Sequence, residues 1–160
     1  MQRKITLLGL TLAGAMLLSY VESLIPPLST VPGIKIGLAN IAVIFALCRI
    51  GMREAYFVSL IRVLLSSLLF GNAVSVIYGL CGAVLSLISM TILKKINIFS
   101  VLGISIVGAV MHNVGQILAA IIILGSNVIV LYLPILILSG TITGAIIGVL
   151  SAVTIKRIKA

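Results

Sequence analysis

Long apolar runs fill almost the whole chain, and they constrain its fold more than any other feature of the sequence. Hydrophobic residues make up 62% and charged residues 8% of the 160 residues, and the mean hydropathy is +1.42. A soluble domain of this size leaves a large share of its surface in water and cannot hide that much apolar surface. The sequence therefore predicts an integral membrane protein.

Six apolar runs are candidates for membrane helices, because a helix needs about 20 predominantly apolar residues to cross the hydrocarbon core. Short polar segments separate the runs, and none of these connections is long enough to form a soluble domain. We therefore expect a single all-α domain over residues 1–160, a bundle of six transmembrane helices. The expected spans are 5–25, 36–50, 55–70, 73–93, 98–124 and 128–155.

Basic residues are confined almost entirely to alternate connections. They precede the first run, follow the second, fourth and sixth runs, and are otherwise limited to Lys35 in the first outer connection and Arg62 inside a run. Cytoplasmic segments carry the excess of Lys and Arg, so both termini are expected in the cytoplasm of a multi-pass protein of the cell membrane. The net charge of +9 then reflects helix flanks in contact with the lipid bilayer and does not indicate a nucleic-acid partner.

Few side chains are available for metal or acid–base chemistry. The chain has two acidic residues, Glu22 and Glu54, no Asp, one His and two Cys. Magnesium–diphosphate chemistry, paired-carboxylate glycoside hydrolysis and EF-hand calcium binding need more carboxylates, and a closed zinc site needs more ligands. His112 has no Ser or Cys at a recognisable spacing and no Asp to orient it. We expect no metal, no cofactor and no enzymatic activity.

Polar side chains from separate runs fall in the same outer half of the predicted membrane. At about 1.5 Å per residue, Glu22 lies roughly 27 Å above Lys4, and His112 lies some 21 Å above the start of the fifth run. Because a polar group at membrane depth is costly unless it is paired or hydrated, this coincidence predicts a cavity, open to the outside, that orients a small solute. The residues assigned to it are Glu22, Lys35, Asn40, Arg62, Tyr78, His112, Asn113 and Gln116.

Two of these residues have alternative explanations. His112 and Gln116 share one helix face at i and i+4, but a histidine on an apolar helix can also be a packing residue bonded to a neighbouring carbonyl. Arg62, near the middle of the bilayer, could be a counter-ion for Glu22, an anchor for an anionic group on the ligand, or part of a structural salt bridge. Because Lys35, Arg62 and His112 outnumber the single acid, the pocket favours an anionic or zwitterionic solute over a cation.

Small residues form stripes on two of the runs. The sixth run carries Gly140, Gly144 and Gly148 at four-residue spacing, and the first carries Gly9 and Ala13. Such stripes let membrane helices approach each other closely. The contact can lie within the bundle or on a face where another membrane protein docks, and the sequence leaves both possibilities open.

Four segments, distributed over nearly the entire chain, carry a family resemblance. They are residues 31–41 (VPGIKIGLANI), 62–71 (RVLLSSLLFG), 108–116 (GAVMHNVGQ) and 132–144 (YLPILILSGTITG). With these motifs the chain resembles the Gx transporter family, which is often labelled heptaprenyl diphosphate synthase component I. That family is similar in size and topology to the S components of energy-coupling factor (ECF) transporters.

The resemblance implies a six-helix substrate-binding subunit that captures a vitamin-like, flavin-like or prenyl-diphosphate-like solute and works with a T-type membrane subunit and two cytoplasmic ATPases. It also implies docking through small residues of the first helix, where Gly9 and Ala13 match positions at which an alanine pair is more usual. The alternative is a membrane accessory component of polyprenyl (heptaprenyl) diphosphate synthesis. Prenyl chain elongation itself resembles a reaction that needs aspartate-rich magnesium sites, and this chain has no Asp.

Overall fold

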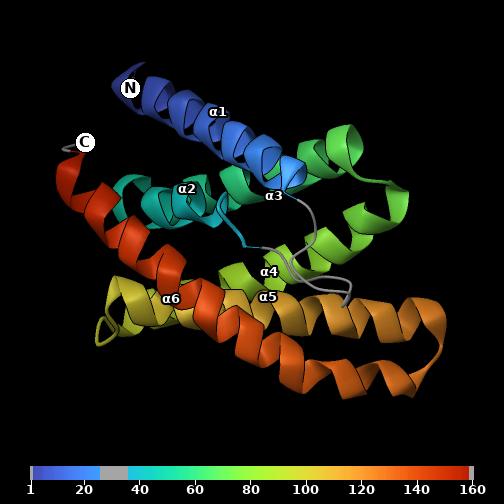
Figure 1. The fold of residues 1–160 in the computed structure, drawn as a ribbon. Coiled ribbons are helices and arrows are strands. Elements are labelled where there is room, and N and C mark those ends of the chain that lie inside the picture. The colour runs from blue at the N-terminus through green and yellow to red at the C-terminus, as the bar shows by residue number, and fades with distance from the viewer. Residues whose placement is uncertain (1, 26–35, 159–160) are drawn as a thin grey trace.

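The computed structural model describes residues 2–25 and 36–158, and over these residues the chain forms helices and no strands (Figure 1). The elements are α1 (Gln2–Leu24), α2 (Asn40–Phe45), the π-helical η1 (Ala46–Ile50), α3 (Met52–Phe70), α4 (Ala73–Ile96), α5 (Val101–Leu124), the 3-10 segment η2 (Asn127–Tyr132) and α6 (Leu133–Arg157). Because η1 continues α2 and η2 leads into α6, these elements make six helical segments. The prediction of an all-α fold with six helical segments is confirmed.

Four of the segments are long and apolar enough to cross a membrane, namely α1, α4, α5 and the continuous stretch Asn127–Arg157. The second expected span, 36–50, was too long. Its helix begins only at Asn40, so six residues of α2 and five of η1 make a segment of about 16 Å. The physical reason lies at Gly37, whose φ of +78° places it in the left-handed region and starts a turn before the helix.

The boundary between α4 and α5 also differs from the expected spans. α4 extends to Ile96, where Asn97 adopts a left-handed conformation with φ of 58° and ends the helix. α5 begins at Val101, because the Ser100 side chain accepts a hydrogen bond from the Gly103 N–H and caps the helix. The fifth span, expected from residue 98, is therefore shorter than predicted, and the fourth is longer.

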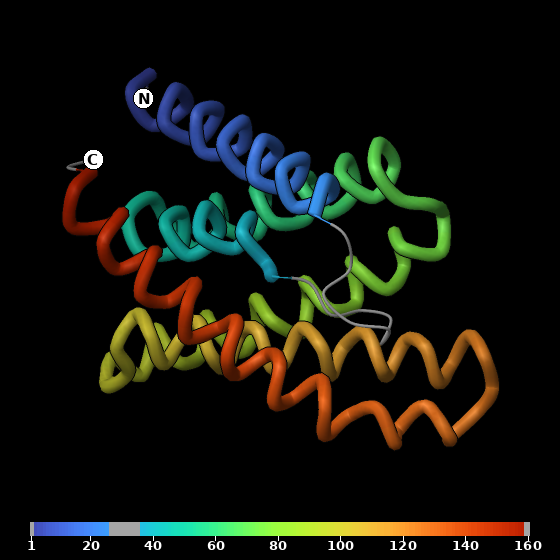
Figure 2. Tube along the Cα trace, viewed as in Figure 1, coloured from blue at the N-terminus to red at the C-terminus, as the bar shows by residue number. Residues whose placement is uncertain are grey.

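The helices fall into two groups that meet along the middle of the molecule (Figures 1 and 2). α5 packs along both α4 and α6, and these three helices form one group. α1, α2, η1 and α3 form the second group, the α1–α3 group, in which α1 packs against each of the others. The two groups meet through contacts of α3 with α4 and of α2 with α6. The start of α1 and the end of α6 lie at the same end of the molecule, whereas the α3–α4 and α5–α6 connections lie at the opposite end (Figure 2).

The end that holds the start of α1 and the end of α6 is strongly basic. Its basic residues are Arg3, Lys4, Arg49, Arg53, Lys94, Lys95, Lys156 and Arg157. Arg49 donates a hydrogen bond of 2.6 Å to the carbonyl oxygen of Ile155. Lys4 and Glu54 form an ion pair with a distance of 2.5 Å between Nζ and Oε1. We call this region the basic end, and the side of a membrane that it faces stays a prediction.

The glycine stripe of α6 is buried against α5. A Cβ atom at Gly144 would lie 2.8 Å from the Cα of Ile106, and one at Gly148 would lie 2.9 Å from the Cα of Leu102. Gly140 is buried on the same face. The assignment of Gly140, Gly144 and Gly148 to partner docking is therefore corrected, because α5 already covers the face that they form.

The small residues of α1 lie in a different environment. Gly9 and Ala13 are both exposed, and a Cβ atom at Gly9 would meet no heavy atom within 4 Å. At Gly9, this face of α1 therefore packs against no described helix. A docking role for Gly9 and Ala13 stays a prediction.

Candidate functional site

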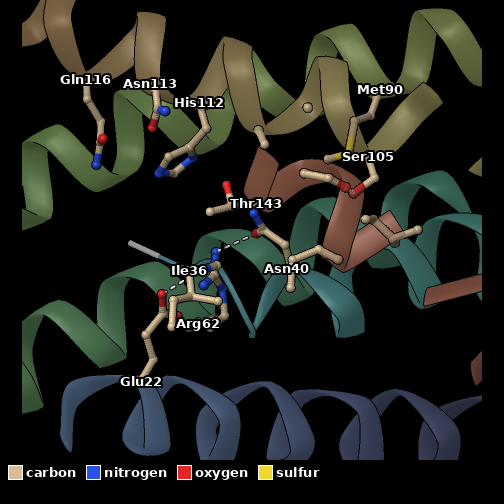
Figure 3. Close-up of a pocket in the computed structure, with 16 residues that line it drawn as sticks. Glu22, Ile36, Asn40, Arg62, Met90, Ser105, His112, Asn113, Gln116 and Thr143 are labelled. Atoms are coloured by element: carbon tan, nitrogen blue, oxygen red, sulfur yellow. Dashed lines mark hydrogen bonds between the residues drawn. The ribbon is translucent and has the colours of Figure 1, made fainter. Parts of the chain in front are cut away.

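A cavity of about 70 Å³ lies where the two groups of helices meet. Side chains of α5 project into it from one side, and Glu22 and Arg62 approach from the other (Figure 3). Its polar lining residues are Glu22, Asn40, Arg62, Ser105, His112, Asn113, Gln116 and Thr143. The volume corresponds to roughly five water molecules, and it is smaller than the 300–1,000 Å³ or so of typical drug-sized ligand sites.

Six of the eight residues assigned to a solute pocket line this one cavity. They are Glu22 from α1, Asn40 from α2, Arg62 from α3, and His112, Asn113 and Gln116 from α5. Lys35 lies outside the described residues. That the six residues bind a solute stays a prediction, but the structure places them around a shared space.

Tyr78 is the exception among the described candidates, because it does not line the cavity. α4 contributes Met90 instead, which lies 12 residues further along the helix and therefore about 18 Å away. Membrane depth alone grouped Tyr78 with the other polar residues. The cavity meets α4 in its last two turns rather than in its first turns, so the assignment of Tyr78 is corrected.

Glycines of the neighbouring helices make room for the polar side chains of α5. A Cβ atom at Gly82 of α4 would lie 3.0 Å from Nδ1 of His112, so the imidazole occupies space left by the missing side chain. A Cβ atom at Gly140 of α6 would likewise lie 2.9 Å from Nδ2 of Asn113. That nitrogen donates a hydrogen bond of 2.7 Å to the carbonyl oxygen of Leu136. His112 is therefore both a packing residue and a cavity residue.

Arg62 and Glu22 carry opposite charges at the same cavity without forming a contact ion pair. Arg62 is 8% exposed, and its Nη2 donates a 3.3 Å hydrogen bond to Oδ1 of Asn40. Its Nε has no hydrogen-bond partner within the part of the chain that the structure describes. Glu22 instead accepts a 2.6 Å hydrogen bond from the Gly37 N–H. The structural salt bridge considered for these residues is not formed, although the carboxylate acts on the guanidinium electrostatically.

The sequence analysis did not assign Ser105 or Thr143 to the site. Ser105 is buried and donates a 2.7 Å hydrogen bond to the carbonyl oxygen of Gly144. Thr143 donates a 3.0 Å hydrogen bond to the carbonyl oxygen of Ser139. Helical periodicity was the signal that could have identified Ser105, because it precedes His112 by seven residues and so shares its face.

The model of the family described as heptaprenyl diphosphate synthase component I matches residues 11–154. No curated protein and no solved structure matches the chain. Since the match covers most of its length, the chain belongs to this family, and the family label expected from the four sequence motifs is confirmed. Family membership and the long apolar helices together indicate a membrane-embedded protein.

Proposed function

We propose that this protein is the substrate-binding membrane subunit of an energy-coupling factor type transporter, similar to an S component. It captures a small anionic or zwitterionic organic solute in the cavity between the two groups of helices. The observation that carries the proposal is the convergence of charged, imidazole and amide side chains from four helices on one cavity in an otherwise apolar chain. Each such side chain is costly in a membrane. Several of them around one cavity therefore indicate a polar binding site.

The proposed orientation places the cavity within reach of the outside. The basic end faces the cytoplasm by the positive-inside rule. Glu22 is near the end of α1 that is remote from the basic end, and Gln116 is in the corresponding half of α5. A solute that enters from outside therefore meets these polar side chains first.

The proposed partners are a T-type membrane subunit and two cytoplasmic ATPases. An exposed face of α1 with Gly9 and Ala13 supports docking of another membrane helix there, because small residues permit close approach of backbones in lipid. The basic end, on the cytoplasmic side in this orientation, would face the ATPases. The energy for delivery of the solute comes from these partners and not from this chain.

A second candidate is a non-catalytic membrane accessory component of polyprenyl diphosphate synthesis, which the description of the matching family favours. Catalysis by this chain is not supported by its carboxylates. Glu22 lines the cavity, whereas Glu54 is paired with Lys4, which is 18 residues and so about 27 Å along α1 from Glu22. Two separated carboxylates do not make the acidic cluster that a magnesium–diphosphate complex needs.

The proposal is tested by native mass spectrometry of the gently purified protein and two variants of α3. Arg62→Met removes the buried guanidinium of the cavity, and Arg53→Met removes an exposed guanidinium at the basic end of the same helix. The wild type and Arg53→Met are expected to retain a small solute, and Arg62→Met is expected to lose it. Equal retention by all three proteins would remove Arg62 from the site.

Pull-down experiments separate the two candidate functions. Co-purification with a T-type subunit and ATPases supports the transport role. Co-purification with a soluble prenyl synthase in place of these partners supports the accessory role. Product formation by this chain alone, from prenyl substrates and magnesium, would contradict the non-catalytic assignment in both.

A further inference from the structure

Three side chains on one wall of the cavity donate hydrogen bonds to the backbone of a neighbouring turn or helix. Ser105 Oγ, Thr143 Oγ1 and Asn113 Nδ2 donate hydrogen bonds of 2.7, 3.0 and 2.7 Å to backbone carbonyl oxygens of α6. A carbonyl oxygen can only accept, so the hydrogens of these three bonds point at α6. The oxygen lone pairs of the three side chains remain for the cavity, and Asn113 keeps a second N–H. We call this set of three residues the acceptor wall.

The acceptor role of Asn113 also follows from its surroundings. Its Nδ2 is lodged beside Gly140, where an added Cβ atom would approach it to 2.9 Å. The amide nitrogen therefore faces α6, and the amide oxygen is the other end of the group (Figure 3). An amide reversed in this place would put two oxygens together, which is unfavourable.

The opposite wall offers donors and a positive charge. Arg62 carries five N–H donors and no acceptor. The 3.3 Å hydrogen bond from Nη2 to Asn40 is longer than the usual range for such bonds, and Nε is without a partner among the described residues. A buried guanidinium with donors to spare is complementary to a carboxylate or another planar anionic group.

We infer that the bound solute is a compact zwitterion, held with its anionic group at Arg62 and its ammonium group at the acceptor wall. An anion alone would leave the lone pairs of the acceptor wall without a donor, and an ammonium alone would leave the spare N–H donors of Arg62 without an acceptor, so a solute with both groups is complementary to both walls. Glu22, at the same cavity, adds negative charge for the ammonium. The small volume of the cavity, about 70 Å³, favours a compact solute such as a short amino acid over a flavin. This inference rests on the proposed function and narrows its solute class.

The experiment uses matched probes that differ only in the amine. Glycine, β-alanine and 4-aminobutyrate are titrated into the protein in lipid nanodiscs, next to acetate, propionate and butyrate. At least one amino acid is expected to bind about tenfold or more tightly than its deaminated partner, the value of a lost charged hydrogen bond. Equal affinity within every pair, or binding by none of the amino acids, overturns the inference.

The acceptor wall is tested with isosteric variants of α6. Thr143→Val removes the wall oxygen, and Thr141→Val is the matched control, because Thr141 makes the same kind of backbone hydrogen bond, at 2.8 Å, on the exposed face of the helix. Thr143→Val is expected to weaken amino-acid binding about tenfold and to leave binding of the deaminated acid unchanged. Thr141→Val is expected to change neither. Ser105→Ala provides the same test if Thr143→Val is not monodisperse on gel filtration.

The outcomes separate this inference from the function on which it rests. If the deaminated acids bind as well as the amino acids, and Arg62→Met abolishes both, the cavity is an anion site, so the zwitterion is wrong and the transport role stands. If neither a retained solute nor a T-type partner is found, the proposed function itself fails. Loss of amine preference in Thr143→Val supports the inference and the solute-binding part of the proposed function.

Discussion

The group formed by α4, α5 and α6 is held together by contacts between backbones. A Cβ atom at Gly115 of α5 would lie 2.7 Å from the carbonyl oxygen of Cys81 in α4, and one at Gly144 of α6 would lie 2.8 Å from the Cα of Ile106 in α5. Distances this short leave no space for a side chain. In a membrane, where apolar surface gains little from leaving lipid, such close packing is a main source of helix association.

The α1–α3 group is held by side chains. Its buried apolar side chains include Ile44, Leu47 and Val58, and polar side chains of α1 make further contacts. α1 buries only Thr11, Ala15 and Ser19 among its described residues. Near its two ends, the Glu22 carboxylate accepts a 2.6 Å hydrogen bond from a backbone N–H before α2, and Lys4 is paired with a carboxylate of α3. The Tyr20 ring adds a tilted contact with an aromatic ring of α3, at 5.4 Å between centroids.

The cavity lies at the boundary between these two kinds of packing. Its acceptor wall belongs to the backbone-packed group and is fixed by glycines, whereas both of its charges belong to the group held by side chains. Substitutions at the backbone contacts of the first group should therefore cost more stability than substitutions of the polar contacts that hold α1 in the second group. The predictions below test this difference.

The largest effect is expected for Gly115→Leu at the contact between α4 and α5. The new side chain would enter space occupied by the α4 backbone, so we expect a loss of more than about 3 kcal/mol or failure to fold, at the upper end of overpacking costs. Gly9→Leu is the control, since Gly9 is exposed and has no neighbour within 4 Å. Unfolding by SDS titration in mixed micelles measures both. A Gly115→Leu protein as stable as wild type would contradict backbone packing here.

A smaller effect on stability is expected for Gly140→Ala, and this variant should also change the cavity. The added methyl group would press on the Asn113 amide at 2.9 Å and move it from its bond with α6, at a cost of about 1–3 kcal/mol. The same change should reduce the preference for amino acids over deaminated acids in the titration. Gly14→Ala, at a position with no neighbour within 4 Å, is the control. An unchanged preference would show that Asn113 does not contribute to the acceptor wall.

In the α1–α3 group, Glu22→Gln is expected to cost about 1 kcal/mol, because the amide still accepts from Gly37 but the hydrogen bond is no longer charge-assisted. Hydrogen exchange should become faster in the last turn of α1, near Glu22, and stay unchanged in α5. The measurement is exchange mass spectrometry of wild type and variant in the same nanodiscs. Faster exchange in α5 as well would mean that the two groups do not respond separately.

Hydropathy was sufficient for the helices but not for all of their ends. The helix after the first connection was expected from residue 36, because Ile36 and Leu38 are apolar. The turn at Gly37 is a property of backbone dihedral angles, and hydropathy does not report it. The α6 stripe shows a similar limit, since the spacing of its glycines indicated a close contact without saying which helix makes it.

Membrane depth predicted six of the residues that line the cavity. Helices rise by a constant amount per residue, so polar residues at the same depth on different helices can lie close together. It included Tyr78 wrongly, since depth gives no position around the bundle. It also missed Ser105 and Thr143, whose hydroxyl groups are compatible with an apolar helix because they bond to backbone carbonyls. The pairing of Arg62 with Asn40 rather than Glu22 depends on side-chain geometry that the sequence does not contain.

The smallest effect is expected at the Lys4–Glu54 pair, which joins α1 to α3 at the basic end. Lys4 is exposed, so Lys4→Ala should cost less than about 1 kcal/mol at pH 7, and less again in high salt. The hydrogen bond from Lys4 lowers the pKa of Glu54 from its ordinary value of 4.5. A lowered carboxyl pKa contributes stability above the ordinary pKa, and this contribution is lost as the pH falls through the lowered value. The stability difference between wild type and Lys4→Ala should therefore vanish in acid, whereas the difference caused by Gly115→Leu should persist, because steric overlap does not titrate.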